Sequence, residues 1–473
     1  MYFEESREKA RFTSSGSITL RGRTVPYNTV CEDNFICGED GQPIATVFTY
    51  SYFRSDVADP SARPVMFCFN GGPGCGSVWV HVGLFGPRRL KIRGDCLDLP
   101  SAPPYELEDN PTCLLDLCDL VMIDPVGTGY GRLFAEKEGE KFFSTHGDAR
   151  CLSYVIDRWL SRYGRHNSPV LLAGESYGTT RAALLAGELL GAGPEGAETL
   201  GISVSGVMLL GTAFLTPLPV ETSALSLGAY AAVNHFHNPQ GKPGEEEFIA
   251  QAEEFAAGEY LTALYQGDAL GEARRRRVVG RLSHFTGLDR DYLLEKDLRV
   301  SPREFMHALL RKRGLSVGYY DGRFTWQSRP LVPDANAIAD DPAMGQFTPA
   351  ILSAMGLLAK ELNITFDRSC LSLSHTVNKA WDRSFKTTPA QSLAGAMRRN
   401  RHLRVFFANG TYDICTTFGY ARYIAAHSQL DPARVKLGRY PAGHMAYLSE
   451  ESARLLGEDM RSFFSAALER RDG

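Results

Sequence analysis

Short apolar runs alternate along the chain with longer stretches in which apolar residues recur at helical spacing. The runs predict strands buried in a covered sheet; they occupy residues 65–69, 120–123, 170–173, 204–210, 403–408 and, less purely apolar, 435–440. Amphipathic stretches at 149–163 and 450–468 predict helices. Residues 17–27 and 44–53 predict two earlier strands, and residues 1–15 are expected to be a flexible start. This alternation is typical of an α/β fold with a mostly parallel central sheet flanked by helices.

The alternation stops after residue 215 and returns late in the chain. Residues 216–331 contain highly charged helical segments, which predict a mostly helical cap insertion over the carboxyl ends of the strands. The expected organisation is therefore a core in two parts, residues 16–215 and 332–473, interrupted by this insertion. The four arginines at 274–277 are interpreted as a solvated helix face rather than an anion site. Further helices are predicted in the second core part, at residues 347–362, 371–382 and 389–400.

Composition and charge bear on the partners and the cellular environment of the protein rather than on its reaction. The chain has 473 residues and a formal net charge of −4, which favours neither a nucleic acid nor a membrane partner. No apolar run is long enough for a transmembrane helix, and the charged amino terminus has no visible signal peptide. The ten cysteines do not form a disulfide-dense framework or a zinc-site spacing. We expect them to be mostly reduced in a cytoplasmic protein, although a removed leader stays open.

The chemistry-bearing residues follow the predicted strands. Residues 174–178 read Gly-Glu-Ser-Tyr-Gly, between an apolar run and a helical run of small residues. This pattern suits a serine held at a sharp turn between strand and helix, with free N–H groups behind it. The motif alone is short and recurs by chance, so Ser176 needs support from the rest of the chain.

Two other loops are rich in glycine. Residues 70–77 read Asn-Gly-Gly-Pro-Gly-Cys-Gly-Ser directly after a central strand, which is typical of a loop that presents backbone N–H groups to an oxyanion. A plain glycine-rich turn is the alternative. Residues 124–130 read Asp-Pro-Val-Gly-Thr-Gly-Tyr. They lack the lysine of a phosphate-binding loop and the glycine spacing of a dinucleotide site, so a phosphate role is disfavoured.

A base and an acid complete the pattern. A serine hydroxyl needs a histidine to take its proton, and the histidine needs a carboxylate to fix its tautomer. Asp413 and His444 each stand in a glycine-containing loop after a late strand. The chain order Ser176, Asp413, His444 is that of the α/β-hydrolase fold. Each residue alone has an ordinary structural interpretation, but three strand-end positions in this order favour catalysis.

Five ordered motifs together resemble the serine carboxypeptidase family. They are Asn-Gly-Gly-Pro-Gly-Cys (70–75), residues 124–130, Gly-Glu-Ser-Tyr-Gly, the Asp413 loop and Gly-His-Met (443–445). The stretch at 440–445 and residues 315–324 are similar to the bacterial branch of that family. The resemblance covers residues 40–465 and implies an enzyme that removes single residues from peptide carboxyl termini, with no cofactor or metal.

The resemblance also implies the roles of the site residues. Ser176 would be the nucleophile, His444 the base and Asp413 the residue that orients it. The remaining roles are an oxyanion hole formed by the backbone of Gly72 and Tyr177, and a clamp for the substrate carboxylate formed by Asn70, Gly71 and Glu175.

Glu175 also has a physical interpretation of its own. An ionised carboxylate beside the nucleophile would repel an anionic substrate, whereas a neutral acid could donate a hydrogen bond to it. Secreted family members often supply a second glutamate beside this one, but the matching stretch here, residues 84–87, is Leu-Phe-Gly-Pro. Burial alone must then raise the pKa of Glu175. Secreted members also tether the equivalent of Cys75 to the cap by a disulfide, and this insertion has no cysteine.

Three functions remain open from the sequence. The first is a serine carboxypeptidase acting on peptides with a free carboxyl terminus. An esterase or acyltransferase could use the same triad, but it has no need of Asn70 and Glu175 as a carboxylate clamp. A catalytically silent binding protein is disfavoured because all three triad residues are present.

Overall fold

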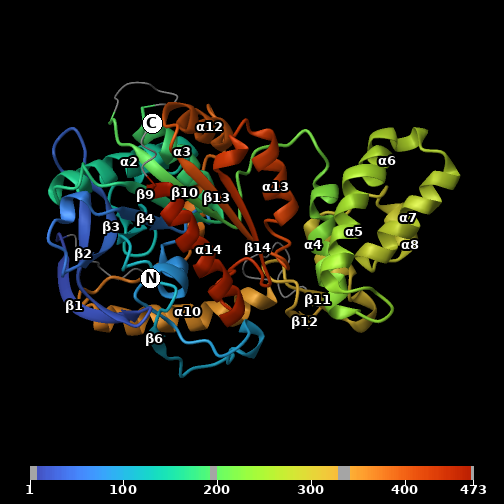
Figure 1. Cartoon of the computed structure of the whole chain (residues 1–473), viewed down its shortest axis with the longest axis horizontal. Helices are drawn as coiled ribbons and strands as arrows, with labels where there is room; N and C mark the ends of the chain where they lie inside the picture. Colours follow the sequence, from blue (N-terminus) through green and yellow to red (C-terminus); the bar gives the residue numbers. More distant parts are fainter. Residues whose placement is uncertain (1–7, 192–199, 329–340, 470–473) are drawn as a thin grey trace.

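A single large sheet forms the centre of the computed structural model, which describes residues 8–191, 200–328 and 341–469 (Figure 1). The ten-stranded sheet has the order β1-β2-β3-β7-β4-β9-β10-β13-β14, with β8 paired to β3. The first three strands are antiparallel, and all pairings from β7 to β14 are parallel. The strand bounds are β1 (Arg11–Leu20), β2 (Arg23–Cys37), β3 (Pro43–Arg54), β4 (Val65–Phe69), β7 (Asp119–Asp124), β8 (Arg132–Leu133), β9 (Val170–Glu175), β10 (Val204–Leu210), β13 (Arg404–Gly410) and β14 (Val435–Tyr440).

Helices cover both faces of the sheet, which explains why the central strands are apolar at every position. In β4, Phe67 and Phe69 pack on one side and Met66 and Cys68 on the other. The first side is covered by α2 (Thr145–Arg162), α3 (Tyr177–Leu189), α12 (Pro389–Arg399) and α13 (Phe418–His427). The second is covered by α10 (Pro342–Glu361) and α14 (Glu450–Leu468). The predicted α/β-hydrolase fold is confirmed.

The amino-terminal prediction is wrong in detail. The single strand predicted at residues 17–27 contains the end of one long strand, a turn and the start of another, because β1 ends at Leu20 and β2 begins at Arg23. Arg21 and Gly22 both have positive φ, as a two-residue hairpin turn requires. The predicted flexible start is also too long, since β1 begins at Arg11 and pairs along its whole length with β2. Residues 1–7 lie outside the described residues.

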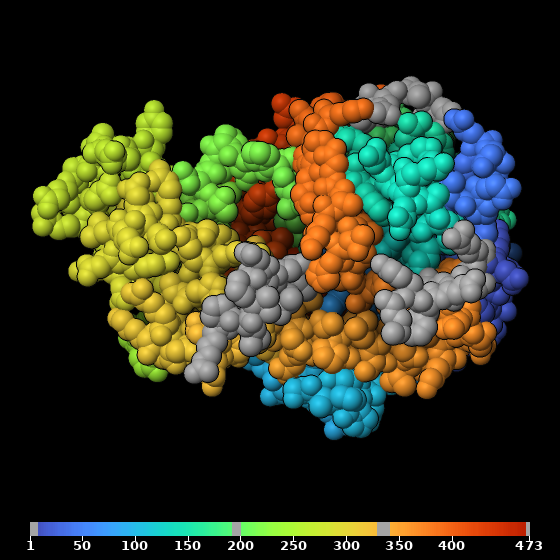
Figure 2. Space-filling model, turned by 180° about the vertical axis from the view of Figure 1, so that it is seen from behind, coloured from blue at the N-terminus to red at the C-terminus, as the bar shows by residue number. Residues whose placement is uncertain are grey.

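The predicted helix at residues 371–382 is helical over only half of its length. Only α11 (His375–Ala380) is helical. Leu371 and Leu373 instead form isolated antiparallel bridges to Gly129 and Cys75, because backbone partners in those two loops offer hydrogen bonds that a helix would forgo. We call residues 371–382 the strap. In Figure 2 the orange segment that contains it stands between the yellow insertion and the teal region around α2.

The insertion between β10 and α10 extends to one side of the sheet (Figure 1). It contains α4 (Thr222–His237), α5 (Glu245–Phe255), α6 (Leu261–Gln266), α7 (Glu272–Thr286), α8 (Arg290–Glu295), α9 (Pro302–Ala308) and the hairpin of β11 (Leu315–Val317) with β12 (Thr325–Gln327). These helices share a hydrophobic core that also takes in Tyr412 and Ile414, the neighbours of Asp413. The loop that carries the predicted catalytic acid is therefore packed into the insertion.

The arginine run of α7 is a solvated face, as predicted. Arg275, Arg276 and Arg277 pair with Asp297, Glu272 and Glu259, and Arg274 donates to Gln266. All ten cysteines are free thiols. Among the described helices, none combines the length and the apolarity needed to cross a lipid bilayer.

A buried ion pair joins α2 to α3 directly behind the Ser176 turn. Asp148 accepts from Arg181 Nε at 2.6 Å, and both side chains are buried. Removing one partner of a buried pair leaves an uncompensated charge. We expect Asp148→Ala to lower the free energy of unfolding by about 3–5 kcal/mol, measured by denaturant titration. The exposed pair of Arg454 and Glu451 is the matched control, and Glu451→Ala should cost less than about 1 kcal/mol.

Candidate active site

Ser176 stands in a strained turn between β9 and α3. Its φ of 59° and ψ of −127° lie in a region that non-glycine residues rarely adopt. Such strain persists only where the surroundings impose it, and it is frequent at functional sites. The surroundings here are tight, because a Cβ on Gly174 would lie 2.0 Å from the carbonyl oxygen of Gly178. The turn therefore matches the nucleophile position predicted from Gly-Glu-Ser-Tyr-Gly.

The glycine-rich loop after β4 packs backbone to backbone against this turn. A Cβ on Gly71 would lie 2.3 Å from the Tyr177 nitrogen, and one on Gly178 would lie 2.9 Å from the Asn70 carbonyl oxygen. Gly72 has a φ of 101°, which favours glycine. Tyr177 is the first residue of α3, so its N–H has no acceptor within the helix. The structure thus brings the two predicted oxyanion-hole residues to neighbouring positions beside Ser176.

Asp413 and His444 are in direct contact. Asp413 Oδ2 accepts from His444 Nδ1 at 2.8 Å, and both side chains are buried. The other lone pairs of Asp413 are occupied, because Oδ1 accepts from the N–H groups of Cys415 and Thr416 at 2.9 Å. The Thr416 hydroxyl also donates to Oδ2, at 2.6 Å. A carboxylate held at Nδ1 places the ring proton there and leaves the Nε2 lone pair for a proton from serine.

The end of β10 brings Ser176 and His444 to one place. The Ser176 N–H donates to the Leu210 carbonyl oxygen at 2.8 Å. The next residue, Gly211, has a φ of 59°, and a Cβ there would lie 2.7 Å from His444 Cε1. His444 Nε2 is buried and has no hydrogen-bond partner among the described residues, so it is not yet bonded to the serine hydroxyl. Such bonds often tighten only when substrate is bound.

Opposing influences act on the pKa of His444. Burial acts to lower it, whereas the charge and hydrogen bond of Asp413, followed by the charge of Glu175, raise it above its ordinary value. The net effect is an increase, so the imidazole holds a proton more readily than a free histidine. A general base with this property needs a pH above its raised pKa to be ready for catalysis.

Glu175 is enclosed beside the triad. Its side chain is 3% exposed, and its Oε2 accepts from Asn70 Nδ2 and, at 3.0 Å, from the Tyr447 hydroxyl. Its Oε1 is buried without a hydrogen-bond partner among the described residues. Burial raises the pKa of Glu175 to about 7, although His444, Tyr447 and Asn70 act to lower it. As predicted, burial dominates; the repulsion from Asp413 is the smallest of these influences.

Hydrogen bonds to other residues hold Asn70 in place. Its Oδ1 accepts from the N–H groups of Trp79 and Val80 at 3.1 Å, at the start of the short helix α1 (Val78–Val80). Its carbonyl oxygen accepts from Arg181 Nη1. The side-chain amide is therefore held toward Glu175 rather than free to rotate. Asn70, Gly71 and Glu175 lie together, as predicted for the clamp.

Sequence reasoning missed Tyr447. Leu84 and Phe85, which match the place of the second glutamate in secreted family members, are fully buried in the hydrophobic core. The hydroxyl that contacts Glu175 comes instead from Tyr447, three residues after His444. A tyrosine near a predicted base is more often a core residue, so the sequence alone carried no signal for it.

A tyrosine-containing segment of the insertion, residues 318–324, also went unassigned. The His444 N–H donates to the Tyr320 carbonyl oxygen at 2.6 Å, and the Gly322 N–H donates to the Tyr412 carbonyl oxygen at 3.0 Å. The Tyr320 ring lies edge-on to the His444 imidazole at 5.2 Å. Asp321 and Arg323 form a buried ion pair within the segment, at 2.7 Å. The segment therefore bonds to both loops that carry the predicted acid and base.

The strap forms hydrogen bonds with the glycine-rich loop and with Tyr177. Asn378 Nδ2 donates to the Pro73 carbonyl oxygen at 2.7 Å, and the Ser374 N–H donates to that of Gly74 at 2.8 Å. Trp381 Nε1 donates to the Tyr177 hydroxyl at 3.0 Å. The glycine loop and the residue after the nucleophile are thus bound by one segment from late in the chain. In Figure 2 a hollow between this segment and the insertion exposes dark-red C-terminal residues.

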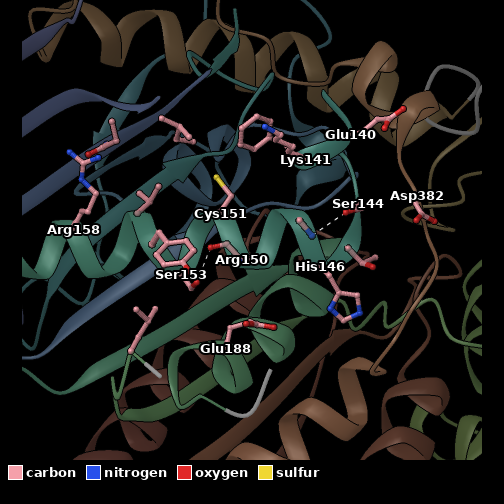
Figure 3. A pocket seen from close by; sticks show the side chains of 18 of the residues that line it. Glu140, Lys141, Ser144, His146, Arg150, Cys151, Ser153, Arg158, Glu188 and Asp382 are labelled. Atoms are coloured by element: carbon pink, nitrogen blue, oxygen red, sulfur yellow. Dashed lines mark hydrogen bonds between the residues drawn. The ribbon is translucent and has the colours of Figure 1, made fainter. Parts of the chain in front are cut away.

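A separate cavity of about 750 Å³ contains none of the predicted site residues. It lies along α2 and is lined by side chains that include His146, Cys151 and Arg158 (Figure 3). Its charged residues are of both signs, so it favours no single class of ligand.

Comparisons with known proteins agree with this arrangement. Residues 44–219 match the serine carboxypeptidase family model. Serine carboxypeptidase-like 5 of Arabidopsis thaliana is 28% identical over 129 residues, which are 27% of this chain and 28% of the relative. Serine carboxypeptidase-like 7 of the same plant is 27% identical over 170 residues, 35% of this chain and 36% of the relative. The matches thus span about a third of the length of these relatives.

A solved structure extends the likeness to the whole fold. The prohormone-processing carboxypeptidase Kex1Δp of Saccharomyces cerevisiae aligns over 92% of this chain and 91% of its own, with a TM-score of 0.58 and 14% identity. These relatives come from a plant and a yeast, so they give no support to the similarity with the bacterial branch, which stays a prediction. The segment that contains Asn70 and Ser176 is thus similar to the serine carboxypeptidase family, and the whole chain shares the α/β-hydrolase fold of the yeast carboxypeptidase.

Proposed function

We propose that this protein is a serine carboxypeptidase that hydrolyses the last peptide bond of substrates with a free carboxyl terminus. The observation that carries the proposal is the position of Glu175, a buried carboxyl group with one unpartnered oxygen beside the Ser176 turn. An acid that keeps its proton at acid pH can donate a hydrogen bond to a substrate carboxylate, which an ionised one would repel.

The proposed reaction passes through an acyl-enzyme. Ser176 Oγ attacks the terminal peptide carbonyl carbon while His444 Nε2 takes its proton, and Asp413 stabilises the imidazolium. The N–H groups of Gly72 and Tyr177 bind the negative oxygen of the tetrahedral intermediate. His444 then gives the proton to the nitrogen of the leaving amino acid as the C–N bond breaks. Water, activated by the same histidine, hydrolyses the ester and restores Ser176.

An esterase or acyltransferase on the same residues is the second candidate. The triad and the oxyanion hole serve acyl transfer of any kind, so they do not distinguish these activities. The geometry around Asn70 does distinguish them. Its side-chain amide makes three hydrogen bonds, which fix it toward Glu175, and an ester substrate would not require this arrangement. We therefore favour the peptidase.

The free carboxylate provides the first test. A blocked dipeptide with a free terminal acid should be cleaved with a kcat/KM at least about 100-fold above that of its carboxyl-terminal amide at pH 5.5, because only the acid pairs with the clamp. The measurement is release of the terminal amino acid or amide by chromatography. Ser176→Ala should abolish both activities. Equal turnover of acid and amide, or turnover of simple esters alone, would contradict the peptidase and favour the second candidate.

The pH dependence provides a second test. Glu175 has a raised pKa, so its proton is present at acid pH and is lost as the pH rises through about 7. For the free-acid peptide, KM should therefore rise above about pH 7, while the acid limb of kcat reports protonation of His444. In Glu175→Gln the side chain donates at every pH, so the alkaline rise in KM should disappear. An alkaline limb that persists unchanged in this variant would refute the assigned role of Glu175.

The segment 318–324 provides a third test. If it fixes the loops of Asp413 and His444, Asp321→Asn should lower kcat about 10–100-fold and change KM less than about threefold, because small displacements of catalytic groups slow the reaction. Asp289→Asn is the matched control, since this exposed aspartate pairs with Arg311 and Lys312 on the insertion surface. It should leave kcat unchanged. A folded Asp321→Asn enzyme with normal kcat would show that the segment does not position the triad.

A further inference from the structure

The two oxygens of the Glu175 carboxyl group have different surroundings. Oε2 accepts two hydrogen bonds, one from the Asn70 amide and one from the Tyr447 hydroxyl at 3.0 Å. Oε1 is equally buried but has no partner among the described residues. A buried polar atom without a partner is costly unless a ligand satisfies it, so Oε1 is the atom left for the substrate.

This asymmetry determines where the proton of the neutral acid resides. A carboxylic acid has one O–H donor, and its other oxygen only accepts. Because two donors already point at Oε2, a proton on that oxygen would compete with both of them. The proton therefore resides on Oε1, which can then donate to one oxygen of the substrate carboxylate.

Tyr447 is held rigidly enough to enforce this arrangement. It is 3% exposed and belongs to the main hydrophobic core. Its ring lies directly over Gly83, where an added Cβ would come within 2.3 Å of the ring. The ring thus has no room to turn the hydroxyl away from Glu175. Tyr447 is also only three residues from His444, so the same loop contributes to the base and to the clamp.

We propose that Tyr447 is a specificity-determining residue of the carboxylate clamp, which with Asn70 fixes the Glu175 proton on Oε1 for donation to the substrate carboxylate. The proposal rests on the proposed carboxypeptidase function. Tyr447 is a permanent donor, so it orients the proton of Glu175 without adding charge.

The other titratable groups around Glu175 do not replace this donor. His444 and Asp413 act on Glu175 through their charges, with opposite signs. Burial, followed by the charge of Glu175, raises the pKa of the Cys75 thiol. Arg181 donates to Asp148 and to the Asn70 carbonyl oxygen. Asn70 and Tyr447 are the side chains of the described residues that donate hydrogen bonds to Glu175.

Tyr447→Phe tests the proposal while keeping the ring that fills the core. Tyr447 stabilises the ionised form of Glu175 by a hydrogen bond, so its loss should raise the pKa of Glu175. The pH at which KM begins to rise should therefore increase by roughly half to one unit. Over the same change, the preference for a free-acid peptide over its amide should fall about tenfold at pH 5.5, because the proton is no longer confined to Oε1. A purely structural role would lower the melting temperature and leave both quantities unchanged.

Tyr440→Phe is the matched control. Tyr440 is another buried tyrosine, and its hydroxyl donates to Asp459 at 2.7 Å, away from the clamp. In this variant, the rise of KM at alkaline pH and the preference for a free-acid peptide should both be those of the wild type.

A second readout needs no turnover. The infrared carbonyl stretch of the neutral Glu175, assigned by its loss in Glu175→Gln, should titrate at a higher pH in Tyr447→Phe. A folded Tyr447→Phe enzyme with an unmoved infrared midpoint and full free-acid preference would overturn the role of Tyr447. A wild-type enzyme that does not prefer the free acid would instead overturn the carboxypeptidase function and the specificity role with it; the infrared titration would then still report whether Tyr447 bonds to Glu175.

Discussion

The close backbone contact between two loops underlies the whole site. Residues 70–72 lie against residues 174–178 at distances that only glycines at 71, 174 and 178 permit. Because of this contact, the N–H groups of the proposed oxyanion hole lie beside Ser176. The Asn70 side chain is also close enough to donate a hydrogen bond to Glu175. The contact also helps to bury the carboxyl group of Glu175, and this burial raises the pKa of that group. One steric constraint therefore arranges both the reaction centre and the substrate clamp.

In the proposed reaction, two groups must be neutral at the same time. The base would need a His444 that has lost its proton, whereas the clamp would need a Glu175 that has kept its own. Each group acts on the other, because the ionised glutamate raises the pKa of His444 and the protonated histidine lowers that of Glu175. The form with a neutral acid and a neutral base carries the same number of protons as the form in which both are ionised. Low polarity favours the neutral form, since burying two charges costs more than burying none.

The sequence was sufficient for the fold and for the contact between Asp413 and His444, because each predicted triad residue lies in a loop just after a predicted strand. Ser176, Asp413 and His444 lie where parallel strands end, so the sheet brings them together. The hairpin at Arg21 and Gly22 was missed because apolar residues alternate on both sides of the turn. The strap and the segment 318–324 were missed for another reason: their geometry follows from partners far away in the chain, such as Pro73 and Tyr412. Tyr447 was missed for the same reason, since its proposed role depends on Glu175, which is far away in the chain.

These long separations have a consequence for how the protein comes to be active. Tyr447 and Glu175 are 272 positions apart, and Asp413 and His444 come from the last quarter of the chain. During synthesis the nucleophile emerges long before its base, its acid and the tyrosine of its clamp. The growing chain therefore carries an inert serine until its final strands join the sheet. For the proposed carboxypeptidase, the order of synthesis itself delays activity until the fold is complete.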